Sequence, residues 1–323
     1  DTALKNWAQA GGLAVRDLGL GNGENVDRYL PWLRSVDTPA HARVVTAGQS
    51  VAAWGGYMHM MMGKENGIGV KTPEDAEKAI ETQIGKGCQG VKLAMDYDML
   101  DENTPQYTPE TVRAIARKAR ELGVWCTAHV QMSKFLRILV ENGIPEMAHT
   151  VLDPIPEDLL DEMAARDIPI TSTLQPINVP RPPLRPEELE RMPPPMREMI
   201  AKMEAIDTAK QERDAVENIR RFHAKGGTVV MGTDTMRMTQ MPDAARVPLR
   251  ELKLLRQAGL SVQDVIAAST KNAAAVCQLD DMGSIQPGKA ASLIAIPGAL
   301  AEVDDLQNVR FVMNRGAVIR NEL

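Results

Sequence analysis

The chain has 323 residues, 44% of them hydrophobic, which is enough for one large α/β barrel or two ordinary domains. The formal net charge is −6 and no cluster of Lys and Arg stands out, so nothing indicates a nucleic-acid-binding protein. No apolar run approaches the length that spans a bilayer, so no membrane association is predicted. Three scattered cysteines without a CxxC pair indicate buried thiols in a reducing compartment, which favours the cytoplasm.

The first residues read as the middle of a helix rather than as the start of a protein. The chain opens with DTALKNWAQAGG and has no initiator Met. We therefore expect the natural N-terminus to lie upstream, together with any targeting segment.

Strands and helices are predicted to alternate along most of the chain. After an opening helix at 3–10, apolar runs predict strands at 13–17, 43–47, 90–94, 124–128, 146–148, 168–174 and 228–231. Helical periodicity and capping residues predict helices at 25–35, 74–86, 109–122, 133–142, 157–166, 197–225, 248–258 and 261–276. Alternation of this kind is typical of parallel βα units.

Seven parallel strands are one fewer than a closed (β/α)8 TIM barrel requires. We therefore predict an α/β fold of this type whose first strand is missing from this chain. Residues 48–70 are expected to form a long loop rich in Gly and Met. The proline-rich residues 176–196 are expected to form an excursion from the barrel, and short strands are expected at 291–296, 310–313 and 317–319.

Four polar residues fall at or inside the C-terminal ends of four different predicted strands. They are Lys92, His129, His149 and Asp234. Catalytic groups of a TIM barrel gather at these ends, and imidazole with carboxylate suits zinc. Each residue alone has an ordinary interpretation, because His129 could be a core histidine and Gly-Thr-Asp is a common turn. Four such residues at the ends of four different strands favour a functional site.

The tail segment LSVQDVIAASTKNAAAVCQLDDMGSIQPGKAASLIAIPG (260–298) closely resembles the C-terminal segment of the amidohydrolase superfamily. Five further motifs occur in the same order as in that family: VRDLG (15–19), GVKLA (90–94), TAHV (127–130), MAHT (147–150) and MGTDT (231–235). The prolidase-like and imidazolonepropionase-like branches of the family are the most similar. The resemblance implies a hydrolase barrel over 1–283 and the C-terminal part of a small β-sandwich over 284–323.

The resemblance also implies a role for each of the four residues. Lys92 would be carboxylated by CO2 and would bridge two divalent metals, here two Zn²⁺. His129 and His149 would ligate the second metal. Asp234 would hold the first metal and act as the catalytic base that takes the proton from the attacking hydroxide.

The family also has a His-x-His pair at the end of the first strand, which this chain lacks. Its five histidines are at 41, 59, 129, 149 and 223. His41 and His223 are expected at the surface. The pair would lie upstream of Asp1, on the missing strand.

Three further residues are candidates for binding the substrate. Tyr57 and His59 lie where the related branches often carry Gly-Gly-His-Gly-His, although His59 could equally be a loop histidine packed on methionines. Gln131 stands where those branches have a second histidine after the fifth strand, which puts its role in doubt.

These observations predict a metal-dependent amidohydrolase that cleaves an amide-type bond with a metal-activated hydroxide. The substrate would be a small molecule: an N-acyl amino acid, an Xaa-Pro-like dipeptide or a cyclic amide. Two alternatives stay open, a mononuclear deaminase-type member and a non-catalytic barrel used as a binding subunit. The sequence leaves open assembly into a homo-oligomer.

Overall fold

The computed structural model describes residues 1–19, 21, 23–61, 67–97, 103–179, 187, 197, 200–202, 204–234 and 248–323. Most of the predicted proline-rich excursion therefore lies outside the described residues. Within them, no helix combines the length and the apolar character needed to cross a membrane.

All seven predicted strands form and pair in parallel. They are β1 (Ala14–Asp17), β2 (Arg43–Thr46), β5 (Gly90–Ala94), β6 (Trp125–His129), β7 (Met147–Ala148), β8 (Ile170–Ser172) and β9 (Val229–Met231). β1 pairs with β2, and β5 to β9 follow one another in chain order within a larger sheet. This is the strand order of a TIM-barrel-type fold, and the predicted fold class is confirmed.

The prediction of a long loop over residues 48–70 is wrong. That stretch contains β3 (Ser50–Ala53), α3 (Tyr57–Met61) and β4 (Gly67–Val70). β3 is fully buried because it pairs in parallel with β4 on one side and with β5 on the other. Glycine weakens the strand signal of β4, and tertiary pairing outweighs that local preference.

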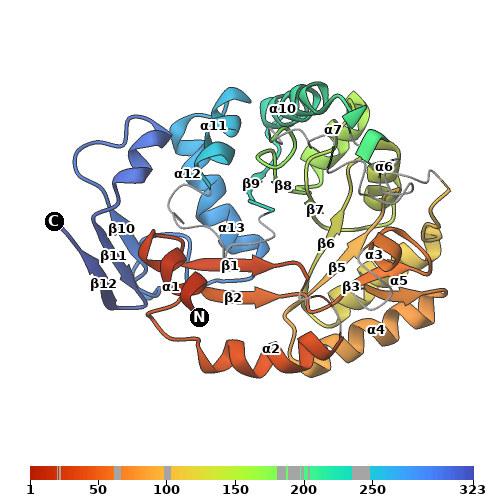
Figure 1. Cartoon of the computed structure of the whole chain (residues 1–323), viewed down its shortest axis with the longest axis horizontal. Coiled ribbons are helices and arrows are strands. Elements are labelled where there is room, and N and C mark those ends of the chain that lie inside the picture. Colours follow the sequence, from red (N-terminus) through yellow and green to blue (C-terminus); the bar gives the residue numbers. More distant parts are fainter. Residues whose placement is uncertain are drawn as a thin grey trace.

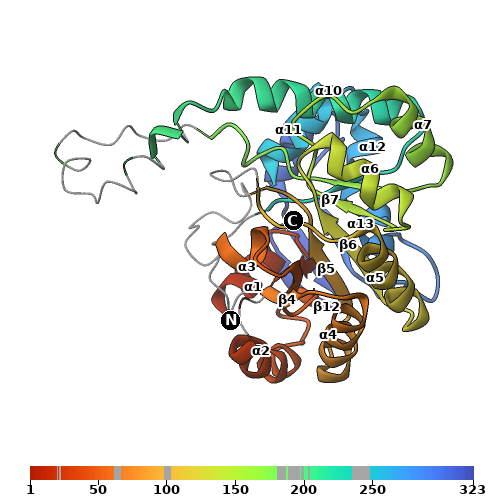
Figure 2. The ribbon, with the colours of Figure 1, turned by 90° about the vertical axis from the view of Figure 1, so that its right-hand side faces the viewer.

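Helices cover the outer side of the sheet, as Figures 1 and 2 show for α4 (Pro73–Lys86), α5 (Pro109–Glu121), α6 (Ser133–Glu141) and α7 (Glu157–Ala165). α4 begins at a capping box in which Thr72 accepts from the Asp75 amide, and it ends at Gly87, whose φ is +104°. These signals are legible in the sequence, which is why the predicted bounds of this helix hold. The remaining helices close to the N-terminus are α1 (Thr2–Gln9) and α2 (Gly23–Ser35).

Two long predicted helices are interrupted. Within 197–225, α10 begins only at Thr208, where the Asp207 side chain accepts a hydrogen bond from the Lys210 amide and caps the helix. Within 261–276, the chain forms α12 (Val262–Ser269) and α13 (Lys271–Val276), because Thr270 leaves the helical region at φ −126° and ψ −89°. α11 (Leu249–Gln257) agrees with its prediction.

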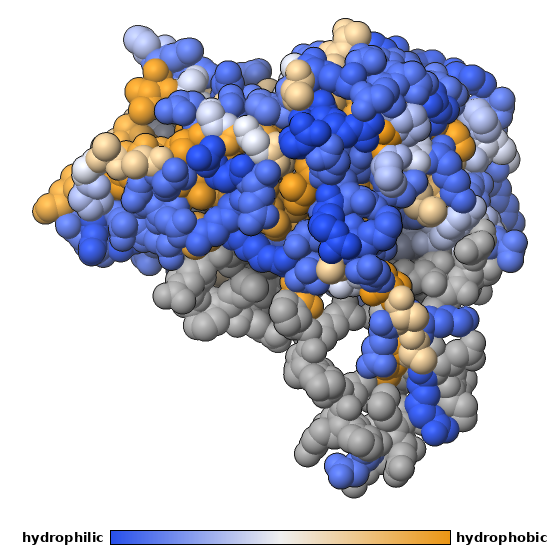
Figure 3. Space-filling view, turned by 90° about the horizontal axis from the view of Figure 1, so that it is seen from above, coloured by the Kyte–Doolittle hydropathy of each residue, from blue (hydrophilic) through white to orange (hydrophobic). Residues whose placement is uncertain are grey.

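The three tail strands form an antiparallel sheet at one end of the molecule (Figure 1). It consists of β10 (Leu293–Ala295), β11 (Phe311–Asn314) and β12 (Ala317–Asn321), with a short 3-10 helix at Val303–Asn308 between the first two. Figure 3 shows a largely hydrophilic face on which hydrophobic side chains gather toward this end. The exposed side chains of Ile294 and Val318 belong to this sheet.

One contiguous hydrophobic core lies between the large sheet and its helices. It includes fully buried side chains such as Leu93 of β5, Ile115 of α5 and Leu136 of α6. The histidine at 41, expected at the surface, is buried at 6% exposure, because its ring lies between Thr38 and Asp1 and hydrogen-bonds to both. His223 is half-buried, with its Nε2 3.6 Å from Asp264.

Candidate metal centre

The sheet brings the four predicted metal ligands to one edge. Lys92 is the third residue of β5, His129 ends β6, His149 directly follows β7, and Asp234 follows β9. His129 pairs with Ala94 of β5 and with Ala148 of β7, so these strand ends are level. Because the strands are parallel, their C-terminal ends face the same way.

Lys92 is buried at 4% exposure, and its Nζ lies 3.3 Å from Nε2 of His149. Burial lowers the pKa of Lys92 to about 7, against the attraction of Asp234, which raises it. A lysine amine with this pKa is partly unprotonated at neutral pH.

His149 is held in an unusual backbone conformation, with φ at +75°. Its Nδ1 lies 3.0 Å from Oγ1 of Thr173 and 3.8 Å from Oδ2 of Asp234. Burial, reinforced by the charge of Lys92, holds the pKa of His149 well below its usual range. A neutral imidazole results, with Nε2 turned to Lys92. Asp234 also has a positive φ, +46°, and strain at such positions is typical of functional sites.

The ring of His129 is enclosed by other side chains. Its centroid lies 4.6 Å from that of His149 in an edge contact, and Tyr57 stacks on it at 4.7 Å. Its Nε2 is buried and forms no hydrogen bond among the described residues, and Oδ2 of Asp96 lies 3.4 Å away. Burial lowers the pKa of His129, whereas the Asp96 carboxylate raises it.

The three predicted substrate-binding residues have different surroundings. Tyr57 lies against His129 and so borders the ligand cluster. His59 is buried and accepts a hydrogen bond at Nδ1 from the Gly55 amide, and its ring packs on Trp54. Gln131 is half-buried just after β6, and its backbone amide donates to the side chain of Asp96. The contacts of His59 are with Trp54 and Gly55, between β3 and α3, whereas Tyr57 and Gln131 lie beside the predicted metal ligands.

Two acidic residues near the cluster were not among the predicted site residues. Asp17 ends β1 and accepts a hydrogen bond from Oγ1 of Thr46, and burial raises its pKa. Its position at a strand end was a usable signal. Asp96 lies two residues beyond the end of β5, which is the same kind of position and a similar signal.

A buried ion pair lies close to Lys92. Arg16 of β1 donates to the Glu146 carboxylate, which precedes β7, and Thr171 of β8 donates to the same carboxylate. The charges of both Arg16 and Glu146 act on Lys92. Polar groups in the interior of this fold are therefore linked from strand to strand.

The residues are compatible with a divalent metal, provided that Lys92 takes part. Among the described residues, no three His, Cys, Asp or Glu side chains lie close enough to hold a metal ion by themselves. Lys92 lies against His149. If its amine became an anionic group with oxygen donors, these oxygens would join the imidazoles of His129 and His149 and the carboxylate of Asp234 as possible ligands. The unbonded, buried His129 also fits a ligand role.

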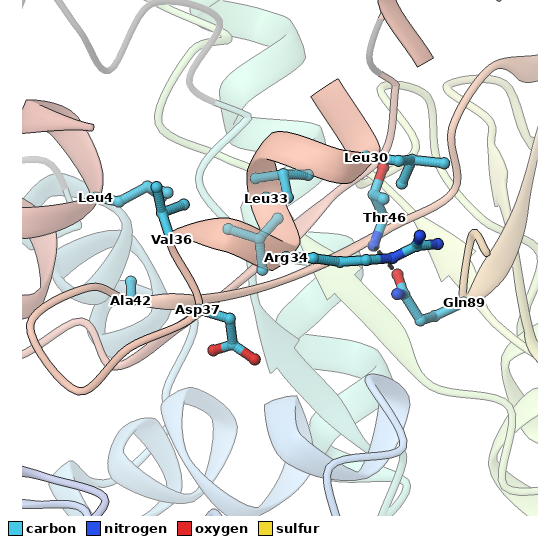
Figure 4. A pocket seen from close by; sticks show the side chains of 10 residues that line it. Leu4, Leu30, Leu33, Arg34, Val36, Asp37, Ala42, Thr46 and Gln89 are labelled. Atoms are coloured by element: carbon cyan, nitrogen blue, oxygen red, sulfur yellow. Dashed lines mark hydrogen bonds between the residues drawn. The ribbon is translucent and has the colours of Figure 1, made fainter. Parts of the chain in front are cut away.

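A small cavity lies elsewhere in the molecule. Its volume is about 90 Å³, and it lies between α1, α2 and β2. Figure 4 shows the side chains that line it, where the Thr46 backbone amide donates to the side chain of Gln89. Among the described residues, its lining includes none of the predicted site residues. The cavity is therefore separate from the metal-ligand cluster.

Comparison with solved structures gives the same fold. A Xaa-Pro dipeptidase with bound methionine is 20% identical, with a TM-score of 0.77 over 99% of this chain and 78% of that one. A putative prolidase from Bifidobacterium longum is 22% identical, with a TM-score of 0.76 over 99% and 76%. The ochratoxinase of A. niger is 17% identical, with a TM-score of 0.76 over 99% and 74%. No curated protein sequence matches the chain.

A family model decides the assignment. The model described as "Amidohydrolase family" matches residues 14–319, from the start of β1 into β12. The match spans nearly the whole chain and includes each predicted ligand. The chain therefore belongs to the amidohydrolase family, a family of hydrolases that act on carbon–nitrogen bonds.

Proposed function

We propose that this protein is a binuclear metal-dependent amidohydrolase with Lys92, His129, His149 and Asp234 as metal ligands. One observation carries the proposal: a buried lysine lies 3.3 Å from a neutral histidine at the strand edge shared with His129 and Asp234. Among the described residues, no carboxylate forms a direct ion pair with this buried lysine, which supports a chemical role. Divalent metals are general in this family, which supports the same assignment.

In this proposal Lys92 acts as an N-carboxylate. The unprotonated amine adds to the carbon of CO2 and loses one proton, which gives an anion with two oxygen donors. The carboxylated Lys92, together with His129, His149 and Asp234, would hold two zinc ions. The resemblance assigns a His-x-His pair to the metal of Asp234, and no such pair occurs in these 323 residues.

The remaining residues supply proton transfer and orientation. A bound divalent metal lowers the pKa of a water and polarises the scissile carbonyl. Asp234, whose side chain is 41% exposed, is accessible to accept the proton of the attacking water and to return it to the leaving nitrogen. Tyr57 stacks on His129 and would form one wall for the substrate, with Gln131 beside it.

We propose as substrate an N-acyl amino acid, an Xaa-Pro-like dipeptide or a cyclic amide. Similar structures include a Xaa-Pro dipeptidase, an ochratoxinase and a molinate hydrolase. These names describe those proteins, and they support a panel of amides as the first compounds to test.

Substitution of Lys92 by Ala in the full-length protein tests the proposal. We expect the zinc content to fall from two ions per chain to one or fewer. Removing a residue that only hydrogen-bonds to a metal ligand lowers metal affinity or activity by about 10–100-fold. Because Lys92 would itself be a ligand, kcat/KM on an amide substrate should fall by at least about 100-fold. Metal analysis and hydrolysis of the panel measure the two effects, with the exposed Lys253→Ala as control.

Each alternative has its own result. Full activity with two metals in Lys92→Ala contradicts the binuclear mechanism. One metal per wild-type chain with deamination of an amino-substituted ring supports a mononuclear deaminase. Metal binding without turnover of any amide supports the non-catalytic barrel.

A further inference from the structure

Asp96 is a buried carboxylate whose orientation is fixed by the backbone. It is 5% exposed and follows β5 by two residues. The Tyr97 amide donates to its Oδ1 at 2.8 Å, and the Gln131 amide donates to its Oδ2 at 2.9 Å. The Met95 amide also donates to the carbonyl of His129, which ties this segment to the end of β6. The carboxylate is therefore held in place by backbone amides that follow β5 and β6.

This fixed carboxylate faces one nitrogen of His129. Its Oδ2 lies 3.4 Å from Nε2, and Nε2 is fully buried without a hydrogen bond among the described residues. A shift of about 0.3 Å would bring the two atoms within ordinary hydrogen-bond range. Tyr57 on the face of the ring and His149 at its edge leave little freedom to rotate Nε2 toward another acceptor.

A neutral imidazole carries its proton on one nitrogen only, so the partner of one nitrogen decides what the other can do. A carboxylate that accepts from one ring nitrogen of a metal-binding histidine fixes the tautomer and orients the ring. Here the carboxylate is on the Nε2 side, which leaves Nδ1 with its lone pair.

We propose that Asp96 is a positioning residue that accepts the Nε2 proton of His129 and thereby presents Nδ1 as the metal ligand. This inference rests on the proposed metal centre, because it gives His129 the ligand role. It adds to that centre a residue that is not one of the four predicted metal ligands.

The test uses zinc affinity and the imidazole protons of the full chain. Chelator competition measures zinc affinity, and long-range ¹H–¹⁵N spectra of zinc-free, ¹⁵N-histidine-labelled protein measure the Nε2–H resonance. The chain has only five histidines, so His129→Ala identifies the signals of residue 129 by their loss. In the wild type we expect a protected Nε2–H on this residue.

Asp96→Ala should lose that protection and weaken zinc binding by about 10–100-fold. Asp96→Asn keeps a carbonyl oxygen that can accept from Nε2, so it should retain the signal and most of the affinity. The control is Asp153→Ala, which removes a carboxylate that accepts from the Ser133 amide and hydroxyl without contact to a histidine. It should leave both measurements unchanged.

Failure of the inference and failure of the metal centre give different results. If His129→Ala weakens zinc binding but Asp96→Ala leaves the affinity or the Nε2–H signal unchanged, the role of Asp96 is overturned. If His129→Ala binds zinc as tightly as the wild type, the metal centre itself is wrong. An Nδ1–H tautomer for His129 in the wild type overturns the inference even if Asp96→Ala does not fold.

Discussion

Glu251 is a carboxylate in the protein interior, on helix α11. It is fully buried and accepts hydrogen bonds from the Ser172 hydroxyl at 2.6 Å and from the Gln175 amide at 2.7 Å. The Gln175 side chain in turn donates to the carbonyl of Thr233, the residue before Asp234. Glu251 therefore supports the segment that follows β8, and through it the tip of β9. Burial raises the pKa of this carboxyl to about 7.

This pKa predicts how stability depends on pH. Because the folded pKa, about 7, exceeds the ordinary pKa of a glutamate carboxyl, 4.5, the folded state binds the proton more tightly between these values. The Glu251 contribution to stability is therefore lost as pH rises from about 4.5 to 7. Glu251→Gln cannot ionise, so it should be more stable than the wild type at pH 8, by up to about 3 kcal/mol. Below about pH 4.5 this gain should vanish.

Urea unfolding of both proteins from pH 4.5 to 8 measures this difference, with the exposed Glu74→Gln as a control. Parallel stability curves for the wild type and Glu251→Gln would contradict the prediction.

The residues of the site differ in how far the sequence reveals them. The strand-end positions of Lys92, His129, His149 and Asp234 were predictable because each follows or lies inside a strand that is legible from its apolar residues. The pairing of Glu251 was not predictable, because its partners lie elsewhere in the chain. Glu251 is 79 positions from Ser172, and one sequence carries no information on that pairing.

At the scale of elements, the approach of β9 to β8 requires a glycine. The Gly232 amide donates to the Ser172 carbonyl at 2.8 Å. A Cβ at residue 232 would lie 2.7 Å from that carbonyl oxygen and 2.8 Å from Cγ2 of Thr171. Contacts this short force the strand end to move, and Asp234 is only two residues further on.

Gly232→Ala should therefore displace Asp234. We expect a loss of about 1–3 kcal/mol in stability from overpacking and a fall of about 100-fold in kcat, as for catalytic groups misplaced by about 1 Å. Gly85→Ala is the matched control, since its Cβ meets no atom within 4 Å and it lies inside helix α4, where Ala stabilises. Unchanged kcat in Gly232→Ala would show that the strand tip adapts without moving Asp234.

The elements themselves were predictable where local signals act. Thr72, Pro73 and Gly87 mark both ends of α4. Strands β3 and β4 lack such signals, because their stability comes from pairing with each other and with β5. The break at Thr270 has a local signal, because Ser269, Thr270 and Asn272 are weak helix formers inside an otherwise alanine-rich stretch.

At the scale of the whole molecule, the Arg16–Glu146 pair joins distant parts of the chain. The two residues are 130 positions apart, and their side chains are 7% and 5% exposed. Arg16 also donates to the carbonyl of Val276 at the end of α13, and its guanidinium lies 5.2 Å from the ring centroid of Trp125. The pair thus links β1, β7 and the last helix of the barrel. Both residues lie in predicted strands, but their pairing could not be matched from one sequence because 130 positions separate them.

Removal of one member should cost more than removal of both. Arg16→Met leaves the Glu146 carboxylate buried without its counter-charge, and we expect a loss of about 3–5 kcal/mol in the free energy of unfolding. In Arg16→Met/Glu146→Leu no charge is stranded, so the double variant should lie closer to the wild type than the single one does. Urea unfolding of the four proteins of this cycle measures the coupling. Additive losses would mean that the pair contributes through packing alone. A strong coupling would instead show that the charged contact between β1 and the residue before β7 itself stabilises the folded barrel.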